Sequence, residues 1–125
     1  LNASASRPLV SQAQPALRFP VRFGGVTQAV ASFDVRVADV TPLLPRALQP
    51  MSFGYGLGEM FVHWQWAARS DFRSYGEFIV GFMVREPYYR QSAAYFHANP
   101  VNSEAARQGG ARMWGMRKVL GHIEH

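Results

Sequence analysis

An alternation of apolar and polar residues along separate segments most constrains what this chain can fold into. Apolar residues of the first segment recur at every second position: Ala29, Ala31, Phe33, Val35 and Val37. Residues 59–68 repeat this period of two, which predicts half-buried β-strands because strand side chains point alternately to the two faces of a sheet. Residues 75–84 are apolar on both faces, which predicts a strand covered on both sides.

Shorter segments complete the predicted order of elements. Residues 92–98 predict a fourth strand, and residues 119–123 predict the start of another. Thr41 and Pro42 have the residue types of a helix N-cap and of the first helical position, which predicts a short helix that continues to Leu48.

A second helix is predicted over residues 104–114, with Asn102 or Ser103 as its N-cap. Gly109 and Gly110 weaken this helix, by about 1 kcal/mol per glycine relative to alanine, but a glycine here allows a close backbone approach. Several strands, two short helices and no internal repeat predict an α+β domain that is mostly antiparallel β. Strands that are apolar on two sides suit a closed β-barrel or cone.

Length and composition exclude several classes. The 125 residues suit one domain. The formal charge is +5, but the arginines are scattered from Arg7 to Arg117 instead of clustering as a nucleic-acid surface requires. No apolar run approaches the roughly 18 residues of a membrane span. The chain has no cysteine, and its four histidines lack the spacing of metal ligands. We therefore expect no nucleic acid, membrane or metal partner. These histidines are His63, His97, His122 and His125.

Lys118 is the single lysine of the chain, beside twelve arginines. Arginine stays charged under nearly all conditions, whereas a buried lysine can give up its proton and become a nucleophile. The plain alternative is that the arginine bias reflects genome composition and that this lysine has no special role.

The sequence around Lys118 resembles the acetoacetate decarboxylase family. That family has a segment of the form V-D-S-D, an alanine, G-R-E, an aromatic, G, an aromatic, P-K-K-L-A and an aliphatic residue. The chain matches it without a gap through Val101-Asn102-Ser103-Glu104, Ala106, Gly110, Trp114-Gly115, Lys118, Leu120 and Ile123. Upstream, Tyr75-Gly76-Glu77 resembles the family's Y-x-E strand, and Val35-Arg36-Val37 with Leu43-Leu44-Pro45 resembles its Y-R-T strand and L-L-P helix. The resemblance covers the chain from about Ala29 onward.

The resemblance implies a role for Lys118 as the amine that forms a Schiff base with a keto substrate. Such an amine must be unprotonated near pH 7, so its pKa must fall well below about 10.4, an activation for which acetoacetate decarboxylase is itself the standard example. Burial or a neighbouring cation produces this fall in pKa. The resemblance also implies that no cofactor is needed.

The resemblance assigns further site residues. Glu77 would be the acid–base group; the alternative is a structural carboxylate bonded to an arginine or to backbone. Arg36 would hold the substrate carboxylate through a forked pair of hydrogen bonds; the alternative is a partner for Asp34, Glu59 or Glu77. Tyr75, Trp114 and Met116 are the remaining predicted substrate-binding residues.

The chain also departs from the family pattern around Lys118. Arg117 and Val119 stand where the family has a proline and a second lysine, Ala111 stands in place of an arginine, and Met116 replaces an aromatic. We expect a Schiff-base lyase acting on a keto acid. One alternative is a divergent member that performs aldol, dehydration or hydrolytic chemistry with the same lysine, and another is a small-molecule binding protein without catalysis.

The domain organisation follows from the same comparison. We expect residues 1–17 to form a flexible arm, and residues 18–125 to form the N-terminal part of one domain. Because family members continue past this point, we expect a second polypeptide to complete the barrel and the completed unit to form a homo-oligomer. The resemblance favours a cytoplasmic location, while Leu1 in place of an initiator methionine fits a processed chain and leaves secretion open.

Overall fold

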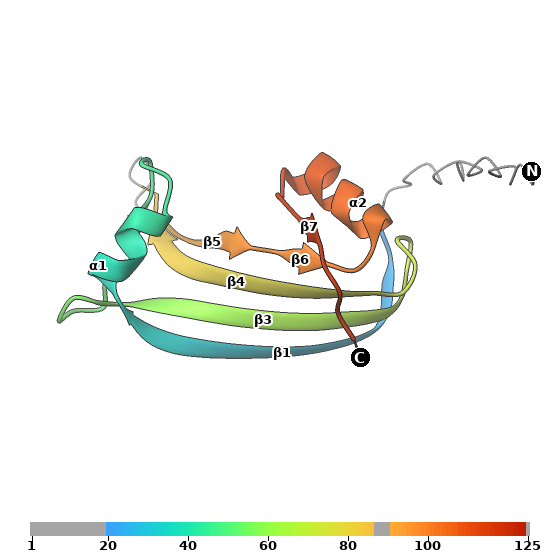
Figure 1. The fold of residues 1–125 in the computed structure, drawn as a ribbon, viewed down its shortest axis with the longest axis horizontal. Coiled ribbons are helices and arrows are strands. Elements are labelled where there is room, and N and C mark those ends of the chain that lie inside the picture. The colour runs from blue at the N-terminus through green and yellow to red at the C-terminus, as the bar shows by residue number, and fades with distance from the viewer. Residues whose placement is uncertain (1–19, 87–90, 125) are drawn as a thin grey trace, which may run out of the picture.

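The chain folds around one strongly curved sheet with a helix at each end of its long strands (Figure 1). The computed structural model describes residues 20–86 and 91–124. Within these residues neither α-helix has the length and apolar character that a bilayer span requires. The elements, in chain order, are β1 (Phe23–Arg36), α1 (Val37–Val40), the 3₁₀ helix η1 (Thr41–Leu43), β2 (Gln49–Pro50), β3 (Leu57–Ser70), β4 (Tyr75–Arg85), β5 (Ser92–Ala98), β6 (Pro100–Val101), α2 (Glu104–Trp114) and β7 (Val119–Leu120).

The sheet is almost entirely antiparallel, and β4 is its centre. β4 pairs with β3 and β2 along one edge and with β5 and β6 along the other. β1 pairs with β3, and β7 extends the sheet by a parallel pairing with β6. The strand path runs β1-β3-β4-β6-β7, and within residues 20–86 and 91–124 its two ends do not pair with each other. The predicted α+β class and the incomplete barrel are therefore confirmed.

The burial of the long strands agrees with the sequence for β4 but not for β1. The predicted two-sided cover of β4 is confirmed, since residues of both faces are buried, among them Ile79 and Phe82. The strand predicted from Thr27 is confirmed, because β1 includes residues 27–36, but its predicted end and the predicted burial of its apolar face are wrong. Val37 begins α1 instead of ending the strand, and Phe33 is 48% exposed. The cause is position: among the described residues β1 pairs with no strand but β3, and the cluster around Val40 of α1 reaches it at Val35, near its end.

The predicted helix from Thr41 to Leu48 is also wrong. The helical segment starts at Val37, and Thr41 is its C-cap, where the hydroxyl donates to the carbonyl of Val37 at 2.8 Å. A 3₁₀ turn follows and stops at Leu43, and Leu44 is extended, with φ −93° and ψ 150°. Pro45 explains this stop, because the ring of a proline disfavours helical geometry in the residue before it.

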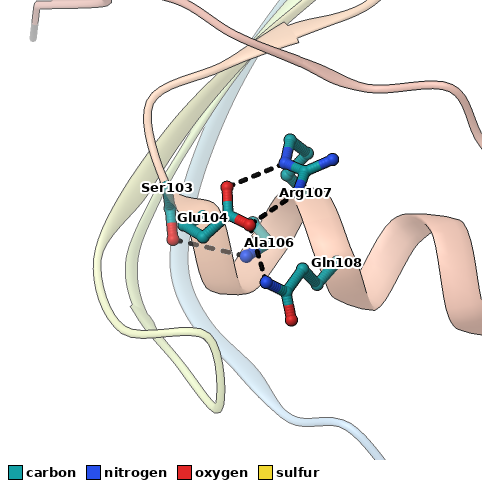
Figure 2. A network of polar contacts seen from close by, with 5 residues as sticks. All are labelled: Ser103, Glu104, Ala106, Arg107 and Gln108. Atoms are coloured by element: carbon teal, nitrogen blue, oxygen red, sulfur yellow. Dashed lines mark hydrogen bonds and ion pairs between the residues drawn. The ribbon is translucent and has the colours of Figure 1, made fainter. Parts of the chain in front are cut away.

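Helix α2 has the predicted bounds, and Ser103 is its N-cap. The Ser103 hydroxyl accepts a hydrogen bond from the Ala106 N–H at 3.3 Å, one of the four donors that a helix start leaves free. In the first turn, Arg107 and Gln108 both donate to the carboxylate of Glu104 (Figure 2). The Arg107 hydrogen bond, followed by that of Gln108, lowers the pKa of Glu104 to about 2. The acid is therefore ionised at the positive end of the helix dipole.

Two core clusters hold the helices to opposite faces of the sheet. Tyr75 of β4 and Ala67 of β3 are register partners and pack with Ala106 of α2. Phe82 of β4 packs with Val40 of α1. Odd and even positions of one strand point to opposite faces, so α2 and α1 cover different faces at different ends of β4. The face under α2 is the one that carries Glu77.

Replacement of Ser103 by alanine is expected to destabilise the protein by about 1 kcal/mol, because the helix start loses its side-chain acceptor. Ser103→Thr, which keeps a hydroxyl, is the matched control and should lose much less. Equilibrium denaturation followed by circular dichroism gives both values. Equal stability of the alanine variant and the original protein would contradict this assignment of the cap.

Candidate active site

A buried ion pair joins the two residues that the sequence places at the centre of the chemistry. Nζ of Lys118 lies 2.7 Å from each carboxylate oxygen of Glu77. The side chains are only 5% and 4% exposed, respectively. Moving two charges out of water costs several kcal/mol per ion, so a buried pair persists only with close contact and additional hydrogen bonds.

Glu77 receives one such hydrogen bond from the neighbouring strand. Gln65 of β3 is its register partner, and the Gln65 amide donates to the carboxylate at 3.1 Å. The same amide lies 3.5 Å from the hydroxyl of Tyr75, which accepts from it. Burial, and then the charge of Glu77, raise the pKa of Tyr75 to about 12, so its phenol keeps its proton at neutral pH. Nζ of Lys118 lies 6.0 Å from the centre of this ring.

A helix end and a short parallel pairing bring Lys118 to Glu77. Gly115 ends α2 in the left-handed conformation, with φ 65°, which glycine adopts without strain. The chain then returns beside β6, where the Val119 N–H donates to the carbonyl of Asn99 at 3.1 Å. A Cβ atom on Gly110 would lie 2.5 Å from Cε of Lys118. A close approach at the glycine pair was predicted for backbone, but the group that approaches Gly110 is a side chain, the stem of Lys118.

Asn102 ties the strand of Glu77 to the segment that follows Lys118. Its side-chain oxygen, Oδ1, accepts a hydrogen bond from the Gly76 N–H at 2.8 Å, and its side-chain nitrogen, Nδ2, donates to the backbone carbonyl of Ile123 at 3.0 Å. Gly76 precedes Glu77, and a Cβ atom there would lie 2.9 Å from side-chain atoms of both Trp66 and Ile123. Asn102 is therefore a structural bridge, and the cap position belongs to Ser103.

Trp114 and Met116 lie beside the ion pair in the chain but line a different feature. They border an open pocket of about 760 Å³ at the end of α2. Asn99 also lines this pocket; it is 3% exposed, and neither polar atom of its amide has a hydrogen-bond partner in the described part of the chain. The full lining consists of Pro45, Ala94, Tyr95, Phe96, Asn99, Trp114, Gly115, Met116 and Arg117.

Arg36 lies away from Lys118. Its guanidinium pairs with Asp39 at 2.8 Å, and its side chain is 76% exposed. Its register partner on β3 is Leu57, eight residues from Gln65, or roughly 26 Å along a strand at about 3.3 Å per residue. The pairing with Asp39 was not among the alternatives that the sequence suggested.

Three polar residues near the ion pair were not predicted from the sequence. Gln65 and His63 lie on the same face of β3, and the buried Nε2 atom of His63 has no hydrogen-bond partner among residues 20–86 and 91–124. Asn99 is the third. Gln65 and His63 belong to residues 59–68, whose alternation predicts a half-buried strand but no functional role for its polar residues. The pairing of β3 with β4 places Gln65 opposite Glu77 and His63 opposite Ile79, and the sequence has no local signal for this register.

The described residues contain no group of three or more histidine, aspartate or glutamate side chains that is placed to hold a metal ion. The polar groups around Glu77 instead form one donor network about a carboxylate. We therefore assign none of these residues to a metal or a cofactor.

The chain belongs to the acetoacetate decarboxylase family, since the family profile described as "Acetoacetate decarboxylase (ADC)" matches residues 6–125. No curated protein sequence matches it significantly. A crystal structure of acetoacetate decarboxylase from Legionella pneumophila is similar over 99% of this chain and 51% of that chain, with a TM-score of 0.68 and 18% identity. A second acetoacetate decarboxylase structure matches 97% of this chain and 46% of that one, with a TM-score of 0.66 and 19% identity.

A more distant structural relative is the enduracididine biosynthesis enzyme MppR. Its structure with HEPES bound is similar over 79% of this chain and 40% of that one, with a TM-score of 0.54 and 19% identity. These likenesses establish the shared fold. The chain spans about half the length of the acetoacetate decarboxylases that it matches.

Removal of one partner of the ion pair is expected to destabilise the protein by about 3–5 kcal/mol, because the other charge stays buried without compensation. Lys118→Met and Glu77→Gln are the two single variants, and denaturant unfolding measures their stability. The double variant should be clearly more stable than the sum of the two losses predicts. Additive losses would show that the two charges are not coupled.

Proposed function

We propose that this protein is a lyase that forms a Schiff base between Lys118 and a keto acid and releases carbon dioxide from it. The observation that carries this proposal is that the single lysine of the chain, in the position of the family's reactive lysine, is buried in contact with a carboxylate. A solvent-exposed lysine at this position would give no such support. Membership of the family favours an enzyme of this general kind.

Glu77 has the geometry to receive the proton that the amine must lose. At 2.7 Å the contact is that of an ammonium with a carboxylate, whereas attack on a carbonyl requires the free amine. Burial removes the hydration that stabilises two separate charges in water. The neutral pair, formed when the proton moves from Nζ to Glu77, is therefore closer in free energy to the ion pair than it would be at the surface.

The reaction that follows needs no external oxidant or reductant. Nζ forms a bond to the carbonyl carbon, and the carbonyl oxygen leaves as water. The bond to the carboxylate carbon breaks, and its electron pair moves into the iminium to give an enamine and carbon dioxide. A proton returns to the carbon, and water hydrolyses the imine to release the ketone and restore the amine. In this proposal Glu77, which contacts Nζ, delivers and accepts these protons.

Gln65 and Tyr75 support this role as positioning residues. Gln65 fixes the Glu77 carboxylate from the neighbouring strand. The phenol of Tyr75, which stays neutral because its pKa is about 12, adds no second negative charge beside Lys118. Arg36 is not part of the proposal, because it pairs with Asp39 at the other end of β1.

A condensation reaction at the same lysine is the second candidate. MppR has been solved in complex with the condensation product of pyruvate and imidazole 4-carboxaldehyde, and that structure matches this chain with a TM-score of 0.53. The replacements at Arg117 and Val119 also separate this chain from the family's usual motif. In this candidate the enamine attacks an aldehyde and forms a carbon–carbon bond.

Borohydride reduction in the presence of a keto acid is expected to add the mass of the reduced adduct at Lys118. The chain has one lysine side chain, so the α-amino group is the only other amine that could form an imine, and an adduct is assigned without ambiguity. The panel should include 3-keto acids and pyruvate with an aldehyde, to separate the two candidates. Peptide mass spectrometry locates the adduct.

The control for trapping is Lys118→Arg, which keeps a positive charge for Glu77 but cannot form an imine because arginine stays protonated. It should give no adduct and no activity while its circular dichroism spectrum is unchanged. If the unmutated protein is folded but gives no adduct with any member of the panel, the result favours a binding protein without catalysis.

Glu77→Gln is expected to lower kcat by roughly 100-fold or more, with a much smaller change in KM, because it removes a proton-transfer group and keeps the size of the side chain. Steady-state kinetics with the substrate found by trapping measures both constants. A rise in KM with kcat unchanged would instead assign Glu77 to substrate binding.

A further inference from the structure

Asn99 has a buried polar side chain that takes no part in the reaction proposed for Lys118 and Glu77. It is 3% exposed, and neither Oδ1 nor Nδ2 has a hydrogen-bond partner within the described residues. Buried amides in native proteins are almost always hydrogen-bonded, because an unpaired one loses its bonds to water without replacement. Both atoms of this amide therefore call for a partner of their own.

The sheet register places Asn99 next to the reactive lysine. Pro100 pairs with Val119 in the parallel pairing of β6 and β7, so the preceding residues, Asn99 and Lys118, are also neighbours. The backbone confirms this, because the Val119 N–H donates to the Asn99 carbonyl. Adjacent strands lie about 4.8 Å apart, so the backbones of Asn99 and Lys118 run side by side.

The same amide lies opposite β4 beside Glu77. Ala98 pairs with Val80 and Val101 pairs with Glu77, so Asn99 falls between these two pairs. Asn99 is the single residue between β5 and β6, so it lies in the stretch of chain that runs along the edge of β4 from Val80 toward Glu77.

The pocket that Asn99 lines is larger than a small keto acid requires. Its volume of about 760 Å³ is within the range of about 300–1,000 Å³ in which proteins bury ligands of many atoms. Its lining is largely apolar and aromatic, with Tyr95, Phe96, Trp114 and Met116, and Arg117 is the one charged residue that lines it within the described part of the chain. Such a lining suits an extended, partly apolar chain.

We propose, on the basis of the function proposed above, that the substrate is a keto acid with an extended substituent that carries a carboxamide, and that Asn99 binds this carboxamide. An amide group presents a donor and an acceptor side by side, so it can donate to Oδ1 and accept from Nδ2 of Asn99 at once. A carboxylate would satisfy only Nδ2, and an alkyl chain would satisfy neither atom. In this proposal the substituent extends from Lys118, which lies outside the pocket, past Asn99 in the pocket wall, and it ends against Trp114 and Met116.

The test compares two 3-keto acids of equal length, one ending in a carboxamide and the other in the isosteric methyl ketone, which cannot donate. The concentration needed for half-maximal borohydride trapping at Lys118 is measured for each on the intact protein. We expect a preference of about tenfold for the carboxamide and a fall to near onefold in Asn99→Leu. Gln49→Leu, which removes an exposed carboxamide from β2, should keep the preference.

The outcomes separate this proposal from the function on which it rests. Efficient trapping of both compounds without preference, or an unchanged preference in Asn99→Leu, overturns the role of Asn99 and leaves the Schiff base intact. If no compound is trapped, calorimetry with the unreactive 3-hydroxy analogues decides: tighter binding of the carboxamide that Asn99→Leu abolishes supports the role, and equal binding overturns it. Asn99→Ala replaces Asn99→Leu if the latter does not fold.

Discussion

The contact between Lys118 and Glu77 is the constraint on which the rest of the site depends. Two charges that are 5% and 4% exposed remain in the interior only when their partners are fixed in place. Each partner is fixed by a different element. Gln65 of β3 holds the carboxylate of Glu77, and the lack of a side chain at Gly110 of α2 leaves room for the stem of Lys118. Each of these residues is explained by the ion pair more directly than by its own local structure.

Strand β4 links this site to the fold. It is covered on both faces, carries Tyr75 and Glu77 near its start, and pairs with β6 directly opposite Glu77. Because β7 joins the same edge through a parallel pairing, the residue before β7 is brought back over the carboxylate. Two strands of only two residues each therefore position the nucleophile, and the long strands provide the rigid surface beneath it.

The parts of the fold that followed from the sequence are those with a strong local period or a clear cap. Helix α2 has its predicted bounds because Ser103 and Gly115 mark its two ends. The helix predicted from Thr41 failed because Pro45 forces Leu44 into an extended conformation, an effect that outweighed the cap signal. The predicted burial of β1 failed because an alternating pattern shows which residues share a face, but not whether another element covers that face.

The sequence by itself determined that Lys118 is the single lysine, that it follows a capped helix after a glycine turn, and that Glu77 lies on an apolar strand. These are properties of neighbouring residues, and short segments carry them. Only the tertiary structure decided that Gln65 meets Glu77, that the backbone of Asn99 pairs with Val119 next to Lys118, and that Arg36 pairs with Asp39 far from both. The physical reason is strand register: a shift by one residue turns every side chain of a strand to the other face, and register is set by contacts between segments far apart in the chain.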